Sequence, residues 1–203
     1  MWRKWVGEKL IMDKIEKFKE ELELIKNEKI RKFAESAIEI MPDYFFVIPA
    51  SSTGKYHSKY ALGEGGLLRH TKAVVRFAYE LFRLSWWKFT DDEKDLLLVA
   101  AILHDGWKSG RIKQKFTVAE HPLIATQELT SNFLSKEFLS EKELQFVIDA
   151  INTHMGEWNK DYKTNKEILP LPKTKYQKFL HLCDYVVSRK MFEEVNFDIG
   201  ASK

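Results

Sequence analysis

The chain has 203 residues, of which 44% are hydrophobic, enough for one substantial buried core. Its 33 basic and 30 acidic residues nearly cancel, so the charge expected of a dedicated nucleic-acid binder is absent. The longest apolar run, Leu96 to Leu103, is too short for a membrane span, which needs roughly 20 residues. The charged start of the chain is unlike an export signal, and Cys183 is the only cysteine. We therefore expect a cytoplasmic protein without internal disulfides or membrane contact.

The first third of the chain is predicted to hold a long helix, a loop and the start of a second helix. Apolar residues recur about every 3.6 positions over residues 9–41, which indicates one amphipathic helix. The glycines, serines and prolines of residues 42–66 are typical of a loop, with an extended piece over residues 44–48. Such a long loop is often functional. The helical period returns over residues 67–84 and places His70 on the apolar face.

The next predicted helix should be the central one. Thr90 and Glu93 form a capping box, in which each side chain bonds to the backbone of the other residue. The residues that follow are apolar all round, which is typical of a helix buried on every side. This helix ends at the adjacent pair His104 and Asp105.

Three more helices are predicted in the remaining part of the chain. Pro122 suits a first helical turn and puts His121 at the start of that helix. A second capping box opens a helix that reaches His154. After a proline-rich break, the last helix begins at Thr174 and carries Asp184. Strand signals are too few for a sheet, so the predicted class is an all-α, compact helical bundle.

Histidines and aspartates at the ends and on the inner faces of these helices suggest a metal site. Imidazole and carboxylate groups are the ligands that divalent metals of borderline and hard character take. A single histidine is more often a hydrogen-bonded core residue, but Asp184 lies among apolar neighbours, where a carboxylate needs a cation or several donors. The predicted ligands are His70, His104, Asp105, His121, His154 and Asp184.

Three short motifs resemble those of the HD superfamily of metal-dependent phosphohydrolases. They are Gly-Gly-Leu-Leu-Arg-His ending at His70, His-Asp-Gly-Trp-Lys around Asp105, and His-Leu-Cys-Asp-Tyr around Asp184. The resemblance spans about Leu67 to Lys190, and it implies a bundle of helices with the metal site at its centre. The glycine and tryptophan that follow Asp105 depart from the isoleucine and glycine of many relatives, which affects the surroundings of the substrate more than metal binding.

The resemblance also implies a division of the chain and a cofactor. Residues 1–66 would form an N-terminal helix and loop that pack on an HD-type metal-binding domain of residues 67–203, in one structural domain overall. Histidines like His121 and His154 occur in members with two metals, so Asp105 is expected to bridge to a second ion. One or two divalent ions (Mn, Fe, Ni, Co or Zn) are expected. The first ion would be held by His70, His104, Asp105 and Asp184.

Other residues are predicted to act beside the metals. Asp105 would help to activate water, and Lys108, one helical turn further on, would contact a phosphoryl oxygen as a point charge. Lys55 and His57, in the predicted loop, would supply further phosphate contacts or a leaving-group acid. The alternative interpretation is that the two lysines are solvated and the loop is ordinary surface. His181 is predicted to orient a ligand carboxylate.

The predicted function is hydrolysis of a phosphate ester by metal-activated water, acting on a small phosphorylated substrate, a nucleotide, or on nucleic acid. The enzyme would be a phosphodiesterase or phosphomonoesterase. The alternatives are a di-iron oxygenase of the HD type, or a nucleotide- or nucleic-acid-binding protein without catalysis. For the binding protein, bases would stack on aromatic residues next to basic ones. These residues could instead cover the core or a subunit contact in an oligomer; they are Trp2, Arg3, Lys4, Trp5, Trp86, Trp87 and Lys88.

Overall fold

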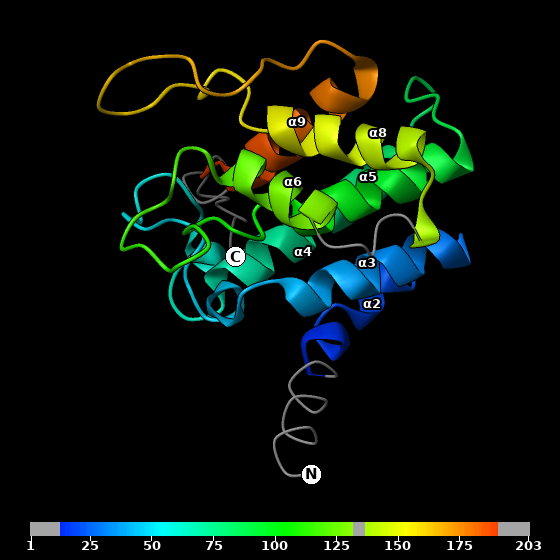
Figure 1. Ribbon diagram of the computed structural model, residues 1–203, viewed down its shortest axis with the longest axis horizontal. Coiled ribbons are helices and arrows are strands. Elements are labelled where there is room, and N and C mark those ends of the chain that lie inside the picture. The colour runs from blue at the N-terminus through cyan, green and yellow to red at the C-terminus, as the bar shows by residue number, and fades with distance from the viewer. Residues whose placement is uncertain (1–12, 132–136, 191–203) are drawn as a thin grey trace, which may run out of the picture.

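The computed structural model describes residues 13–131 and 137–190, and in these residues it is a bundle of helices (Figure 1). Their only β pairing is an isolated bridge between Lys160 and Glu167, so the all-α prediction is confirmed. No helix of this part of the chain is long and apolar enough to span a bilayer. The α-helices are Lys19–Leu22 (α2), Glu28–Ile40 (α3), Gly66–Leu81 (α4), Asp91–Leu103 (α5), His121–Ser131 (α6), Glu141–Thr153 (α8) and Lys175–Ser188 (α9).

Helix α5 lies at the centre, in contact with α3, α4, α8 and α9. Every residue from Asp95 to Leu103 is buried, as expected of a helix that is apolar all round. At its start the Thr90 hydroxyl accepts from the backbone N–H of Glu93, and the Glu93 carboxylate accepts from the backbone N–H of Thr90. The predicted capping box is therefore confirmed, and so is the predicted central helix.

The prediction of one helix over residues 9–41 is wrong. Residues 9–12 lie outside the described residues, and the rest is divided between a short helical stretch at 13–16, α2 and α3. The backbone N–H groups of Lys26 and Asn27 donate to the buried carboxylate of Asp95, at 3.0 and 2.7 Å. The Asn27 side chain then caps α3. A carboxylate from a distant helix thus fixes the break.

The extended piece predicted over residues 44–48 is also wrong, because Asp43–Phe46 forms a 3-10 turn (η1). This turn lets Phe45 and Phe46 point inward, where their ring centroids lie 6.1 and 6.2 Å from that of Phe18. The Tyr44 hydroxyl donates to the backbone carbonyl of Gly110 at 2.6 Å. Packing of the aromatic rings therefore outweighs the β propensity of this stretch.

The long connections gather at one end of the bundle, on the left in Figure 1. The connection between η1 and α4 contains a second 3-10 turn, Lys59–Ala61 (η2). Two hydrogen bonds join this connection to the end of α9. The Ser58 hydroxyl donates to the carbonyl of Arg189 at 2.7 Å, and the Tyr60 hydroxyl to that of Val187 at 3.2 Å. These bonds hold the 50–62 loop beside the end of the bundle where the predicted ligands lie.

Candidate metal centre

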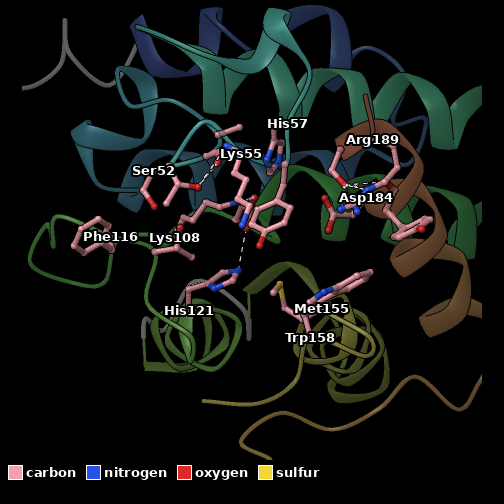
Figure 2. A pocket seen from close by; sticks show the side chains of 18 of the residues that line it. Ser52, Lys55, His57, Lys108, Phe116, His121, Met155, Trp158, Asp184 and Arg189 are labelled. Carbon is pink, nitrogen blue, oxygen red and sulfur yellow. Dashed lines mark hydrogen bonds and ion pairs between the residues drawn. The ribbon is translucent and has the colours of Figure 1, made fainter. Parts of the chain in front are cut away.

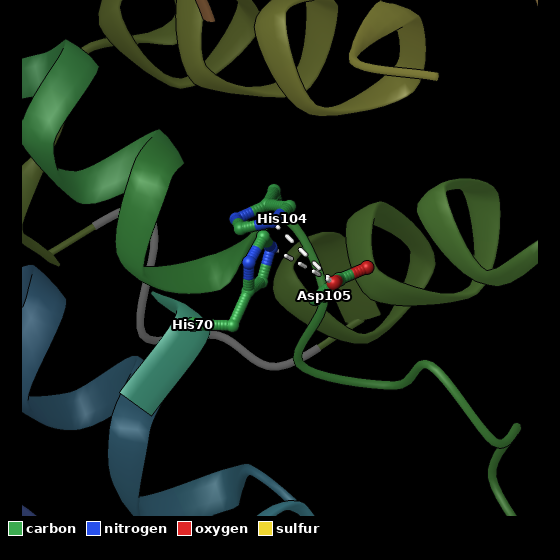
Figure 3. A group of neighbouring side chains, drawn as sticks. All are labelled: His70, His104 and Asp105. Atoms are coloured by element: carbon green, nitrogen blue, oxygen red, sulfur yellow. Dashed lines mark ion pairs between the residues drawn. The ribbon is translucent and has the colours of Figure 1, made fainter. Parts of the chain in front are cut away.

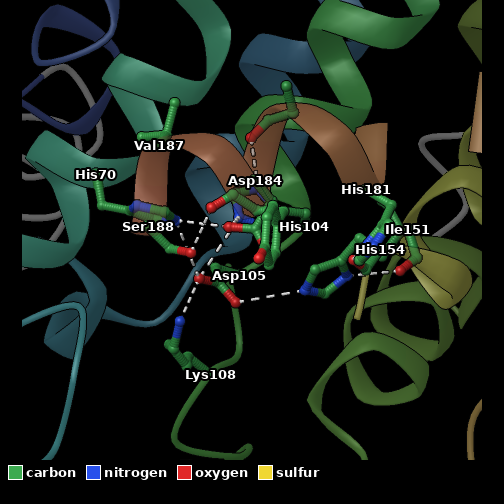
Figure 4. Close-up of polar contacts among 12 residues, drawn as sticks. His70, His104, Asp105, Lys108, Ile151, His154, His181, Asp184, Val187 and Ser188 are labelled. Atoms are coloured by element: carbon green, nitrogen blue, oxygen red, sulfur yellow. Dashed lines mark hydrogen bonds and ion pairs between the residues drawn. The ribbon is translucent and has the colours of Figure 1, made fainter. Parts of the chain in front are cut away.

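The structure brings the six predicted metal ligands together (Figures 2, 3 and 4). His70 comes from α4, His104 and Asp105 from the end of α5, and His121 from the start of α6. Three overlapping groups have their ligand atoms within 4.8 Å of one another, and each could hold a metal ion. The groups are His70, His104 and Asp105; His104, His154 and Asp184; and Asp105, His121 and His154.

The two oxygens of Asp105 face different histidines (Figure 4). Its Oδ2 lies 3.5 Å from Nε2 of His104 and 3.9 Å from Nε2 of His70. Its Oδ1 lies 3.0 Å from Nε2 of His121 and 3.7 Å from Nε2 of His154. This is the arrangement that a carboxylate needs to bridge two neighbouring ions. Asp184 belongs to the first side, with its Oδ1 3.0 Å from Nε2 of His70.

Backbone carbonyls set the direction of three of the imidazoles. His104 and His154 are the C-caps of α5 and α8, where the last carbonyls of a helix lack a partner within the helix. A carbonyl can only accept, so each Nδ1 carries a hydrogen and donates it, which leaves each Nε2 facing the cluster. The pairs are Nδ1 of His104 with Ala101 (2.7 Å), of His121 with Val118 (2.8 Å) and of His154 with Ile151 (2.7 Å).

The buried polar atoms of the cluster fit a bound cation. Nε2 of His104 and Oδ1 of Asp105 are buried, and neither has a hydrogen-bond partner among the described residues. Such atoms are costly to bury unless something pairs with them. Burial alone would raise the pKa of Asp105, but Lys108 and His104 hold it well below its usual range. Although burial opposes it, Asp105 and Asp184 raise the pKa of His104 to about 10. The cluster therefore attracts positive charge, which a divalent ion supplies.

The structure places Lys108, Lys55 and His57 at the same site (Figure 2). Nζ of Lys108 lies 2.5 Å from Oδ2 of Asp105. The His57 ring stands edge-on to that of His70, with the ring centroids 4.8 Å apart. Burial, reinforced by Lys108, lowers the pKa of His57 to about 3, so this imidazole is neutral at physiological pH. Lys55 is exposed at the rim.

These side chains surround a cavity of about 600 Å³ that opens to solvent. Asp105, His121 and Asp184 line it, so the predicted ligands are accessible to a small molecule. Its volume lies within the range of roughly 300–1,000 Å³ that small-molecule sites occupy. The cavity can therefore hold a small molecule against the candidate metal ligands.

His181 has a different partner from the predicted one. Its Nδ1 donates to the backbone carbonyl of His154 at 2.7 Å, and its Nε2 lies 3.3 Å from the carboxylate of Glu157. The three-residue spacing from Asp184 is right for a shared helix face, but the ring turns toward the end of α8. Gly156, at φ +55°, leaves room for it, because a Cβ there would lie 2.1 Å from Cε1 of His181.

Part of the cavity wall was not predicted from the sequence. It is lined by Met155, Trp158, Tyr185 and Arg189, and the signal for them was their position within five residues of the candidate ligands His154 and Asp184.

The aromatic residues that were predicted as base-stacking groups are not found in the wall of the cavity as described. Trp87 packs against Phe179, and Trp86 is 72% exposed and does not line the cavity. Trp2, Arg3, Lys4 and Trp5 lie outside the described residues.

Comparison with known families gives one match. The model of the HD domain matches residues 67–188, more than half of the chain, and this range includes all six candidate ligands. No significant match was found among curated proteins or among solved structures. Both the match and the helical fold agree with the resemblance seen in the three motifs. The chain belongs to the HD domain family, within the HD superfamily of metal-dependent phosphohydrolases.

Proposed function

We propose that the protein hydrolyses a phosphate ester of a nucleotide or oligonucleotide by means of metal-activated water. The observation that carries the proposal is the placement of Asp105, whose two oxygens face separate pairs of histidines at the floor of an open cavity. Two adjacent divalent ions could bind there, one on each side of Asp105. Nitrogen and oxygen ligands bind Mn, Fe, Co, Ni and Zn. Bound there, the ions would lower the pKa of a water molecule and neutralise phosphoryl oxygens.

The protein's own residues would prepare the site for this chemistry. Asp105 and Asp184 are ionised, because neighbouring cationic and imidazole groups hold the pKa of each carboxyl well below its usual range. Lys108 adds a positive charge at the edge of the cavity, where it would contact a phosphoryl oxygen. His57, neutral and without a hydrogen-bond partner among the described residues, can donate to or accept from the substrate. Lys55 would attract the phosphate from the rim.

The charge around the cavity also supports an anionic substrate. The segments that contribute to its wall, residues 50–65, 105–120, 154–174 and 184–190, carry twelve basic and seven acidic residues. The whole chain carries 33 basic and 30 acidic residues, so the remainder of the chain is slightly acidic. The net positive charge of these four segments raises the local concentration of a phosphorylated substrate near the cavity. It favours phosphate-ester hydrolysis over oxidation of an uncharged carbon substrate.

The test is elemental analysis of the purified protein, followed by a screen of phosphate mono- and diesters with each candidate metal. Asp105→Asn is the matched control, because it keeps the shape of the side chain and removes its charge. We expect turnover by the metal-loaded wild type, and loss of bound metal and turnover together in Asp105→Asn. Absence of hydrolysis for every ester, or full activity of Asp105→Asn, would contradict the proposal.

A further inference from the structure

Next to the metal ligands, two aromatic rings and a guanidinium form a wall of the cavity, which we call the aromatic wall: Trp158, Tyr185 and Arg189. The rings of Trp158 and Tyr185 stack with their centroids 5.5 Å apart and an interplanar angle of 19°. The Arg189 guanidinium carbon lies 4.5 Å from the Tyr185 centroid and 5.4 Å from that of Trp158. All three side chains line the cavity that contains Asp105 and Asp184.

The wall is held in place before any ligand binds. Nε and Nη2 of Arg189 both donate to the hydroxyl of Ser188, at 3.2 and 2.9 Å. Asn159, which follows Trp158, is buried, and its side chain donates to the carbonyl of Leu169 at 3.0 Å. Tyr185 follows the ligand Asp184 directly on α9. In Figure 2, Trp158 lies on the same side of the cavity as Asp184 and Arg189. A ligand in contact with the wall is therefore also beside the metal ligands.

The wall leaves much aromatic surface open to the cavity. Trp158 is 46% exposed and Tyr185 is 38% exposed, although large apolar side chains are usually covered. The contrast is Trp87, whose ring packs against Phe89 and Phe179 in the core. Nucleobases stack on aromatic rings and on guanidinium groups, and all the bases can stack in this way.

We propose that the aromatic wall is a base-binding subsite, which stacks the nucleobase of the substrate while its phosphate lies over the metal ligands. The inference rests on the proposed function for the position of the phosphate. It assigns the nucleotide part of that function to particular side chains, Trp158, Tyr185 and Arg189. Lys55 and Lys108 line other parts of the same cavity and would contact phosphate groups.

The test compares AMP with ribose 5-phosphate, which share sugar and phosphate and differ only in the base. Binding to the metal-loaded protein is measured by calorimetry, or as KM if a ligand is turned over. We expect the wild type to prefer AMP by about 5-fold to about 140-fold, the range that base stacking on an aromatic residue contributes. Trp158→Ala and Tyr185→Ala should lose most of this preference. Trp86→Ala, an exposed tryptophan outside the cavity, should keep it.

Equal affinity for the two ligands in the wild type, or no measurable binding of either, would refute the subsite. So would a preference for AMP that persists in the Trp158→Ala, Tyr185→Ala double variant. A change of oligomeric state with an unchanged preference would assign the wall to a subunit contact instead. Circular dichroism and metal content show whether each variant remains folded. Ester hydrolysis without a base preference would overturn only the subsite, whereas base preference without hydrolysis of any ester would overturn only the proposed function.

Discussion

His121→Ala should remove one metal ion and leave the other. Nε2 of His121 lies 3.0 Å from Oδ1 of Asp105 and 3.3 Å from Nε2 of His154. The group of His70, His104 and Asp105 does not include it. The substitution therefore takes a ligand only from the Oδ1 side of Asp105. We expect two ions per chain in the wild type and one in His121→Ala at the same free metal concentration.

The loss should also be visible as a change in thermal stability. At a free metal concentration one hundred times Kd, a site that exists only in the folded state contributes about 2.7 kcal/mol. For a chain of this size, each kcal/mol shifts Tm by roughly 2–4 °C. The rise in Tm on adding metal should thus be smaller in His121→Ala than in the wild type by roughly 5–11 °C.

The assay is elemental analysis together with thermal unfolding, with and without a chelator. The quantity to compare between the variants is the difference in Tm with and without chelator. His121 is only 1% exposed, and its truncation leaves a void that lowers Tm in both conditions, so Tm alone would mislead. Asp105→Asn, which alters both sides of the cluster, should show almost no rise. If His121→Ala retained both ions, or lost both in parallel, the assignment of separate sites would be refuted.

Three further substitutions have clear expectations. Lys108→Ala should keep both ions but lower turnover, as measured by metal content and steady-state kinetics; unchanged kcat and KM would remove Lys108 from the mechanism. Gly156→Ala should lower the unfolding free energy by roughly 1–3 kcal/mol, because its Cβ would meet His181. Gly54→Ala is the control, with φ +65° and no atom within 4 Å, and an equal loss there would show that backbone strain alone is responsible. Tyr44→Phe should cost about 1 kcal/mol for its hydrogen bond. Burial raises the pKa of Tyr44 to about 12, so its contribution to the unfolding free energy should be lost as the pH rises from about 10. Urea titrations at several pH values measure this loss. The unfolding free energy of the variant should change less with pH in the alkaline range than that of the wild type.

Features set by neighbouring residues could be predicted from the sequence. The capping box of Thr90 and Glu93 depends on residues three apart, and so does that of Ser140 and Glu143. The apolar composition of α5 likewise identifies it as the central helix without knowledge of its neighbours. The six candidate ligands could be selected because each lies at a helix end or among apolar residues, where its chemistry is out of place without a partner.

Features set by distant contacts could not be predicted. The break before α3 depends on the Asp95 carboxylate, which accepts from the backbone of Lys26 and Asn27. No local signal shows that this carboxylate reaches the loop, although Asn27 itself is a good capping residue. The partner of His181 depends in the same way on the turn at Gly156. Hydrophobic periodicity gives the face of a helix but not the atom that a polar side chain on that face will contact.

The candidate metal ligands and the side chains that would contact substrate come from different parts of the fold. All six candidate ligands lie within helices or at their ends, and the carbonyls of α5 and α8 orient His104 and His154. The side chains that would contact substrate come mostly from the connections, with Lys55 before α4 and Trp158 after α8. Since connections lie on the surface and tolerate sequence change better than helices do, substitutions there should change substrate preference at little cost to metal binding. Exchange of the 155–173 segment for an unrelated loop should therefore abolish base preference and retain both ions.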